Sequence, residues 1–329
     1  INKGKTSLNF RKKMSEEAFS ETAYYDSLVS NYFNKYNNNK FPKKKTIFGN
    51  LIENLRYGEN PHQKSAYYTP DNEKNIWKKI QGKKLSYNNY FDMESAINIV
   101  YEFDKLGCVI VKHANPCGFG LGKTNVDAYL NAVSTDPISY FGGIVAFNNR
   151  VDKEVALLMS KVFLECIISP SFSKEAVLIL EKKKNLRLIE LSKDSFQKKS
   201  NKLIVKSVFN GFLYQNKDTM IKHKDEFNVV TKKQPTKEQL EAIIIGWKIV
   251  KSVKSNAIVL TNNMKTLGVG AGQMSRIDSV KIAIRKSKEN DLNLSLKILP
   301  TNGLITSPLI DFTELDNFCD KLNSIKYPS

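Results

Sequence analysis

The feature that most constrains the fold is a short apolar run that ends abruptly at two titratable residues. Residues 108–111 read Cys-Val-Ile-Val, which is too short for a helix and rich enough in β-branched side chains to predict a strand buried on both faces. Lys112 and His113 follow at once, and the proline and three glycines within residues 115–122 predict a loop after them. Ligands bind at the carboxyl ends of the parallel strands of open α/β sheets, so we expect this pair to face a substrate.

The Lys112–His113 pair also has an ordinary explanation, because a lysine that ends a strand is usually solvated and a histidine in a loop is usually incidental. Its context favours function. The chain has only three histidines, and His62 lies in a similarly unusual segment, LRYGENPHQ, at residues 55–63. The pair is therefore our candidate centre of chemistry.

Length and composition predict a globular protein. The chain has 329 residues, 41% of them hydrophobic, which suffices for one large domain or two to three ordinary ones. It has neither a long apolar stretch nor an apolar segment near its start, so we expect no transmembrane helix, no signal peptide and a cytoplasmic location. Because its first residue is Ile1, we expect it to be a piece of a longer translation product.

The formal net charge of +18 raises the question of nucleic-acid binding. The lysines are spread along the whole chain, however, and arginine is scarce, which argues against a binding stripe. A positive field of this kind favours small anionic substrates such as phosphates. The four cysteines contain no CxxC pair, which argues against a structural zinc site or a disulfide framework.

Hydrophobic periodicity predicts helices and strands in alternation. A helix is predicted over residues 6–33, followed by a polar linker that contains Pro42. Thr236 is the predicted N-cap of a helix that runs to Val250. The alternation predicts α/β layers with mostly parallel strands, and no internal repeat is visible in the residues. Further helices are predicted over residues 91–103, 125–133, 153–163 and 174–184, and strands over residues 166–169, 186–191, 205–214 and 255–260.

The segment GVGAGQMSR, residues 268–276, has two interpretations. Glycine-rich backbone at a helix start presents N–H groups and the positive end of the helix dipole to an anion, which favours a phosphate-binding turn. Its spacing matches neither a dinucleotide fingerprint nor a P-loop, so a tight structural turn is the alternative. Arg56 and Arg276 are notable because arginine is rare here and a guanidinium suits a phosphate, although a surface ion pair explains either residue equally well.

The residues around His113 argue against a zinc deaminase site. That chemistry needs a glutamate two residues after the histidine and a PCxxC pair. Pro116 and Cys117 are present, but Asn115 stands at the glutamate position and Gly120 stands where the second cysteine belongs. We therefore expect no metal.

Six segments of the chain stand out together. They read, in order, LRYGENPHQ, KKLSYNNYFDMESA, VKHANPCG, DPISYFGGIVAFN, SNAIVL and GVGAGQMSRIDSV. In order and spacing they resemble the formyltransferase domain of the bifunctional purine-biosynthesis enzymes, which carry 5-aminoimidazole-4-carboxamide ribonucleotide (AICAR) transformylase and IMP cyclohydrolase activities. The resemblance covers about residues 47–290, and the first helix is similar to the last helix of the cyclohydrolase domain.

The resemblance implies a domain order and a fold. Residues 1–34 are expected to be the C-terminal helix of the cyclohydrolase domain, 35–46 a linker, 47–297 the transformylase domain and 298–329 an atypical tail. The implied fold class is α/β, with tandem cytidine-deaminase-like α/β/α subdomains that lack the zinc and with the second subdomain truncated. The family works as a homodimer with sites built across the interface, so we expect a homodimer here.

The resemblance also implies transfer of a formyl group from 10-formyltetrahydrofolate, the co-substrate, to the 5-amino group of AICAR. Lys112 and His113 match the catalytic pair of the family. A histidine of near-neutral pKa can accept the proton of this weakly nucleophilic amine, and the lysine can stabilise the oxyanion that forms. Ile277 matches a folate-side position, and the implied substrate-binding residues are Arg56, Tyr57, His62, Gly142, Glu165, Asn256 and Arg276.

The chain departs from the family pattern after about Lys297. The expected SDAFFPF-like motif, QPGG-like turn and basic, aromatic C-terminus that helps to bind folate are all missing there. We expect a substituted tail of the kind that a shifted reading frame produces. Two alternatives to a working transformylase follow from the sequence: a catalytically impaired remnant that binds nucleotide or dimerises without turnover, and a lysine-rich nucleic-acid binder.

Overall fold

The computed structural model describes residues 4–70, 76–199, 203–218, 229, 234–292, 298–300 and 306–308, with only the backbone described for residue 199 and for the last two segments. The chain divides into two compact units, Ile1–Asn75 and Ile76–Ser329. Within the described residues there are eight helices, and none of them combines the length and the apolar character that a membrane span requires.

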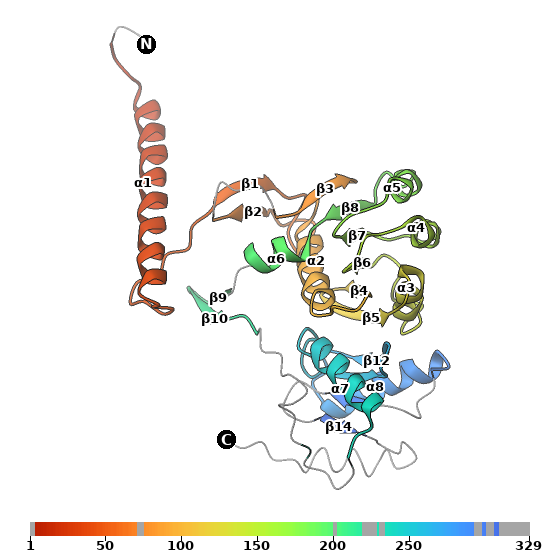
Figure 1. Ribbon diagram of the computed structural model, residues 1–329. Coiled ribbons are helices and arrows are strands. Elements are labelled where there is room, and N and C mark those ends of the chain that lie inside the picture. Colours follow the sequence, from red (N-terminus) through yellow and green to blue (C-terminus); the bar gives the residue numbers. More distant parts are fainter. Residues whose placement is uncertain are drawn as a thin grey trace. The chain divides into compact units, whose positions relative to one another are not determined.

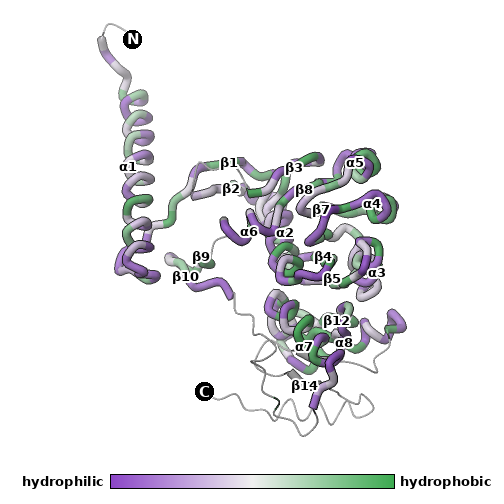
Figure 2. Tube along the Cα trace, viewed as in Figure 1, coloured by the Kyte–Doolittle hydropathy of each residue, from purple (hydrophilic) through white to green (hydrophobic). Residues whose placement is uncertain are grey.

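The first unit contains one long helix and one hairpin. Helix α1 (Leu8–Tyr36) begins at Ser7, whose hydroxyl accepts the Phe10 N–H, and the helix predicted over residues 6–33 is confirmed. Strands β1 (Asn50–Asn54) and β2 (Ala66–Thr69) pair antiparallel. No residue of α1 is buried, so the green apolar positions along it in Figure 2 remain accessible to solvent.

The second unit is built around a six-stranded sheet in the order β3-β8-β7-β6-β4-β5 (Figure 1). Only the β6–β7 and β7–β8 pairs are parallel. The prediction of mostly parallel strands is therefore wrong, and β4 itself is antiparallel to both of its neighbours. The strands are β3 (Lys78–Gln81), β4 (Gly107–Lys112), β5 (Asn115–Leu121), β6 (Ile144–Phe147), β7 (Cys166–Ser169) and β8 (Arg187–Glu190).

Helices cover both faces of this sheet. Helix α2 (Tyr87–Val100) packs on the face that carries Val109 and Val111. Cys108 and Ile110, which alternate with them, point to the opposite face, where the helices α3 to α5 lie. The side chains of these four β4 residues, 108–111, are fully buried, as predicted for this apolar run. These helices are α3 (Asn125–Val133), α4 (Lys153–Ser160) and α5 (Lys174–Leu180), and α6 (Lys193–Lys199) follows β8.

Strand β5 occupies the segment that was predicted to be a loop. Its glycines alternate along the strand and face α3: a β-carbon on Gly118 would lie 2.0 Å from the Ala132 carbonyl oxygen, and one on Gly120 would lie 2.5 Å from the Ala128 carbonyl oxygen. The glycines therefore mark a close approach of helix backbone to strand backbone. Read from the sequence alone, they indicated an interruption of regular structure.

The C-terminal part of this unit repeats the same order of elements. Helix α7 (Lys237–Val250) precedes strand β11 (Ile258–Thr261), a turn, strand β12 (Thr266–Gly270) and helix α8 (Arg276–Glu289), just as α2 precedes β4, β5 and α3. In β12 a β-carbon on Gly268 would lie 2.1 Å from a carbonyl oxygen of α8. No internal repeat is visible in the residues, but the order of helices and strands does repeat. Strands β13 (Ile298–Pro300) and β14 (Thr306–Pro308) complete the sheet β12-β11-β13-β14.

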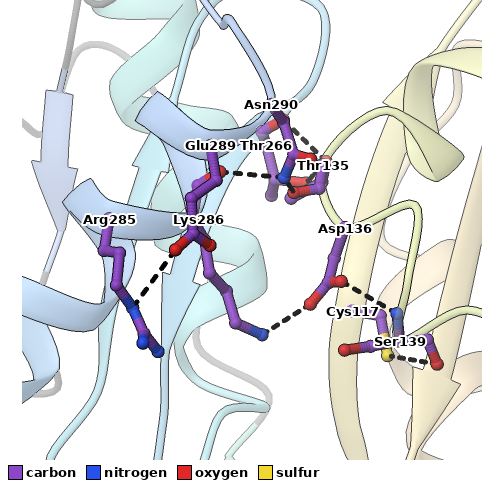
Figure 3. A network of polar contacts seen from close by, with 9 residues as sticks. All are labelled: Cys117, Thr135, Asp136, Ser139, Thr266, Arg285, Lys286, Glu289 and Asn290. Atoms are coloured by element: carbon purple, nitrogen blue, oxygen red, sulfur yellow. Dashed lines mark hydrogen bonds and ion pairs between the residues drawn. The ribbon is translucent and has the colours of Figure 1, made fainter.

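Strand β5 lies beside strand β12, and polar contacts join the two repeats. The Thr135 hydroxyl donates to the Thr266 carbonyl oxygen at 2.7 Å, and Lys286 reaches from α8 to Asp136 with Nζ 2.5 Å from Oδ2 (Figure 3). Burial acts to raise the pKa of Asp136, but the hydrogen bonds from Lys286 and Ser139 outweigh it, so the pKa lies below its ordinary value. The loop of residues 134–139 is thereby held against α8.

One predicted strand is two strands. Residues 205–214 form parts of β9 (Leu203–Val208) and β10 (Gly211–Asn216), which pair antiparallel. Phe209, in the turn between them, has a positive φ of 50°. The single apolar run concealed this reversal because a phenylalanine rarely adopts such a conformation.

Candidate active site

His113 and Ala114 form the two-residue turn that joins β4 to β5. Lys112 pairs with Asn115 as the last rung of the ladder, and the two residues between them have φ values of 53° and 58°. Two successive positive φ angles define a type I′ hairpin turn, which normally requires Asn-Gly or a similar pair. Here neither residue is glycine, and the imidazole of His113 is exposed at the tip of the turn.

Helix α2 holds this turn from one side. The carboxylate of Asp92 accepts the N–H of Ala114 at 2.6 Å. The hydroxyl of Ser95 donates to the Ala114 carbonyl oxygen at 3.0 Å. Burial raises the pKa of Asp92 above its ordinary value, although the hydrogen bond from Ala114 acts in the opposite direction. Asp92 was not among the site residues expected from the sequence, because an acidic residue within a helix gives no sign of which turn it contacts.

Lys112 connects the turn to the loop before β6. Its Nζ donates to the Phe141 carbonyl oxygen at 3.0 Å, and Gly142 follows with a φ of 73°. The N–H of Gly142 donates to the Phe163 carbonyl oxygen at 2.8 Å. The structure thus brings Lys112 and Gly142, both expected at the site, to one place.

Glu165 follows in the same group of segments, because its N–H donates to the Gly143 carbonyl oxygen at 3.1 Å. Its carboxylate forms an ion pair with Arg187, a buried residue at the start of β8 whose side chain is only 4% exposed. The Arg187 Nη2 donates to the Lys84 carbonyl oxygen at 3.2 Å, while its buried Nε has no hydrogen-bond partner within the described residues. Arg187 is a second residue that the sequence did not reveal, since its partner lies 22 residues away.

Asn256 and Arg276 lie where the second repeat opens. The side-chain amide of Asn256 donates to the carbonyl oxygens of Gln273 and Met274, both at 3.0 Å, and the backbone carbonyl oxygen of Asn256 accepts the Ser279 hydroxyl. Arg276 is the first residue of α8 and is half-buried, as is the adjacent Ile277. These contacts place Asn256 beside the loop that leads into α8.

A single backbone segment links this loop to the His113 turn. The Lys254 N–H donates to the side chain of Asn115 at 3.0 Å, and its carbonyl oxygen accepts the Gly272 N–H at 2.8 Å. The β4–β5 turn of the first repeat therefore lies at the open end of the β11–β12 hairpin of the second repeat. Of the glycines in GVGAGQMSR, the first two lie in β12 and pack against α8, and only Gly272, with a φ of 66°, lies in a turn. Neither a phosphate-binding turn nor a single tight turn describes the whole segment.

Arg56, Tyr57 and His62 lie together in the first unit, in the loop between β1 and β2. The guanidinium of Arg56 stands 5.1 Å from the centre of the Tyr57 ring. The loop is closed by the Gly58 N–H, which donates to the Gln63 carbonyl oxygen at 2.8 Å. The side chain of His62 is exposed on this loop.

The chemistry available at the turn follows from its two side chains. An exposed imidazole on a fixed turn can take or give a proton in general acid–base catalysis, and an adjacent ammonium can stabilise a developing negative charge. Within the described residues, no three His, Cys, Asp or Glu side chains converge as a metal ion would require.

Comparison with known proteins extends these observations. A sequence model described as AICARFT/IMPCHase bienzyme matches residues 1–286. Proteins named "Bifunctional purine biosynthesis protein PurH" are similar to most of the chain: the one from Persephonella marina is 43% identical over 92% of it, that from Leptospira biflexa 44% over 89%, and that from Listeria monocytogenes 46% over 87%. The chain in turn covers 59%, 57% and 56% of these relatives.

Proposed function

The chain belongs to the AICARFT/IMPCHase bienzyme family, and from this membership we propose that it carries the formyltransferase activity of a bifunctional enzyme that also has IMP cyclohydrolase activity. The reaction transfers a formyl group from 10-formyltetrahydrofolate to the 5-amino group of AICAR in purine biosynthesis. The observation that carries this proposal is the Lys112–His113 pair at the fixed β4–β5 turn.

The two side chains divide the work of formyl transfer. The imidazole of His113 takes a proton from the amine as its nitrogen attacks the formyl carbon. The ammonium of Lys112 stabilises the negative charge that develops on the formyl oxygen, and the proton then moves to the folate nitrogen as the carbon–nitrogen bond to folate breaks. The Phe141 carbonyl oxygen orients Lys112 through its 3.0 Å hydrogen bond.

The remaining site residues bind the two substrates. Arg276 is the phosphate partner, because a guanidinium at the first turn of a helix adds its charge to the positive end of the helix dipole. Ile277 contacts the folate. Glu165 is held in one orientation by Arg187, and the other nucleotide contacts come from Arg56, Tyr57, His62, Gly142 and Asn256.

A specific fold and assembly belong to this proposal. The repeated order of helix, hairpin and helix supports tandem cytidine-deaminase-like subdomains, with residues 1–34 as the last helix of a cyclohydrolase domain, 35–46 as a linker and 47–297 as the transformylase domain. The substituted tail at residues 298–329 lies almost entirely outside the described residues. We place the protein in the cytoplasm as a homodimer, with AICAR and reduced folate as its small-molecule partners and no nucleic acid, membrane or metal.

A formyl-transfer assay with AICAR and 10-formyltetrahydrofolate tests the proposal, with the whole protein that the gene encodes as the enzyme. We expect His113→Ala to reduce kcat about 10²- to 10⁴-fold and Lys112→Met to reduce it about 10²- to 10³-fold. Lys123→Met removes an exposed lysine just beyond β5 and serves as the matched control with unchanged kcat. Full activity of His113→Ala would remove that residue from the mechanism, and nucleotide binding without turnover by the unmodified protein would favour an impaired remnant.

A further inference from the structure

We propose that Asp92 is a positioning residue that fixes the His113–Ala114 turn in its left-handed conformation and so sets the direction of the His113 imidazole. This inference rests on the formyl-transfer function proposed above, because it assigns Asp92 a part in that reaction. Asp92 acts through the backbone of the turn, and we assign it no contact with the reacting atoms.

The turn needs support because its residues do not favour its shape. A β-carbon disfavours the left-handed region, and His113 and Ala114 occupy that region in succession. Ala114 is also buried, with 9% of its surface exposed, so water does not satisfy its backbone groups. Residues held in such a conformation persist only where the surroundings determine it, and they cluster at functional sites.

The surroundings supply hydrogen bonds to backbone groups of both residues of the turn. Asp92 accepts the Ala114 N–H, with Oδ1 2.6 Å from the nitrogen. Ser95 donates to the Ala114 carbonyl oxygen, and the Asn115 side chain donates to the His113 carbonyl oxygen at 3.1 Å. Asp92 is the carboxylate among these three side chains, and it therefore makes the stronger, charge-assisted bond.

The position of Asp92 on α2 makes this support rigid. Helix α2 begins with a capping box between Ser86 and Asn89, one turn before Asp92. Its buried face packs into the core next to β4. A turn bonded to this helix therefore keeps a fixed position relative to the end of β4, and the charged groups that face Asp92 are His113 and Lys254.

Asp92→Asn tests the proposal with little change of shape. An amide keeps one acceptor oxygen but carries no charge, so the bond to the Ala114 N–H becomes weaker. We expect kcat for formyl transfer to fall about 10- to 100-fold while the KM for AICAR changes less than about 3-fold, because misplacing a reacting group by about 1 Å has this effect. Glu94→Gln is the matched control, since Glu94 is exposed on the same helix and pairs with Lys217; its kcat should not change.

Ala114→Gly in the Asp92→Asn background separates positioning from general stability. Glycine adopts a positive φ without strain, so the turn regains its shape without the carboxylate, and we expect at least about 10-fold of the lost kcat to return. A loss of kcat without such recovery, or a loss expressed wholly in KM, would overturn the proposal. The urea midpoint of each variant shows whether the protein is folded in the assay.

The amide proton of Ala114 gives a readout that does not depend on activity. With ¹⁵N-labelled alanine, a short bond to a carboxylate predicts a downfield amide proton that moves upfield in Asp92→Asn and is unaffected by Glu94→Gln. An Ala114 amide that is indifferent to Asp92→Asn would refute the contact itself. If the unmodified protein lacks formyl transfer while this signature is present, the proposed function fails and the contact between Asp92 and the turn stands.

Discussion

Replacing Gly118 with alanine tests the close packing of β5 on α3. The new β-carbon would lie 2.0 Å from the Ala132 carbonyl oxygen and 2.9 Å from the Thr135 β-carbon. Real β-carbons do not approach other heavy atoms closer than 3.0 Å, so strand and helix must separate by at least 1.0 Å, the difference between 3.0 and 2.0 Å. Neither partner is the end of a flexible side chain, so the helix must move as a whole.

The size of the effect follows from how tightly α3 is held. The helix packs with fully buried Ala128 and almost fully buried Ala132 on its inner face, and close-packed interiors do not absorb such a shift locally. Overpacking costs about 1–3 kcal/mol, and a backbone collision belongs at the upper end. We expect Gly118→Ala to lower the free energy of unfolding by about 3 kcal/mol, or the thermal midpoint by about 6–12 °C.

Tryptophan fluorescence during urea denaturation measures the change in stability of the structural unit that contains Gly118. The chain has two tryptophans, Trp77 and Trp247, and both lie in the unit Ile76–Ser329. Gly211→Ala is the control, because its β-carbon would meet nothing closer than the Val208 carbonyl oxygen at 3.9 Å, and it should change stability by less than about 0.5 kcal/mol. Equal midpoints for Gly118→Ala and Gly211→Ala would refute the packing argument.

Three further predictions follow from buried groups of the same unit. The pKa of Asp136 is lowered in the folded protein, so its stabilising contribution is complete above the ordinary value of 3.8 and declines as the pH falls towards the folded pKa. Asp136→Asn should lower the free energy of unfolding by about 1–2 kcal/mol at pH 7 and flatten the acid limb of stability measured by urea denaturation. Glu165→Gln should cost about 1–3 kcal/mol because it leaves the buried Arg187 without its counter-ion, whereas Glu289→Gln, from an exposed pair, should leave the urea midpoint unchanged. Burial raises the pKa of Cys117 to about 12, so peptide mapping should find this thiol unmodified by iodoacetamide at pH 8 in the native protein and modified in denaturant; rapid native alkylation would contradict the burial.

Local patterns predicted most elements of the fold. The helices at residues 125–133 and 237–250 and the strand at residues 166–169 have the bounds that periodicity and capping residues indicated. These elements are determined by their own side chains, through apolar spacing and through caps such as Thr124 and Thr236. The bounds of these elements can therefore be predicted without knowledge of their tertiary contacts.

The errors arose where a distant partner decides the outcome. The glycines of β5 looked like interruptions because their purpose, the approach of α3, lies outside the local sequence. The direction of β4 relative to its neighbours could not be read from an apolar run, which is equally compatible with parallel and antiparallel pairing. The repeated order of elements is hard to see in the residues because the shared signal is short, a Gly-x-Gly spacing in β5 and in β12 that packs each strand against the helix that follows it.

Some residues of the candidate site could likewise be expected from the sequence, and others could not. The end of an apolar run indicated Lys112, whereas Gly142, Glu165 and Asn256 were expected only from the family resemblance. Hydrogen bonds join the segments of these four residues in the second unit. Asp92 was missed although it lies in the segment KKLSYNNYFDMESA, because its partner, the Ala114 amide, lies 22 residues away in sequence. The segment itself does not indicate which group the carboxylate contacts.

The two hairpins run in opposite directions where they meet. Asn115 at the tip of the first contacts Lys254 at the open end of the second, and Leu121 at the open end of the first contacts Met264 at the tip of the second. Two equivalent tips therefore exist, and only one carries adjacent lysine and histidine; the other reads Asn-Asn-Met-Lys at residues 262–265. The proposed catalytic pair therefore occupies one of two equivalent hairpin tips, and the second hairpin meets this tip through its open end, where Lys254 contacts Asn115.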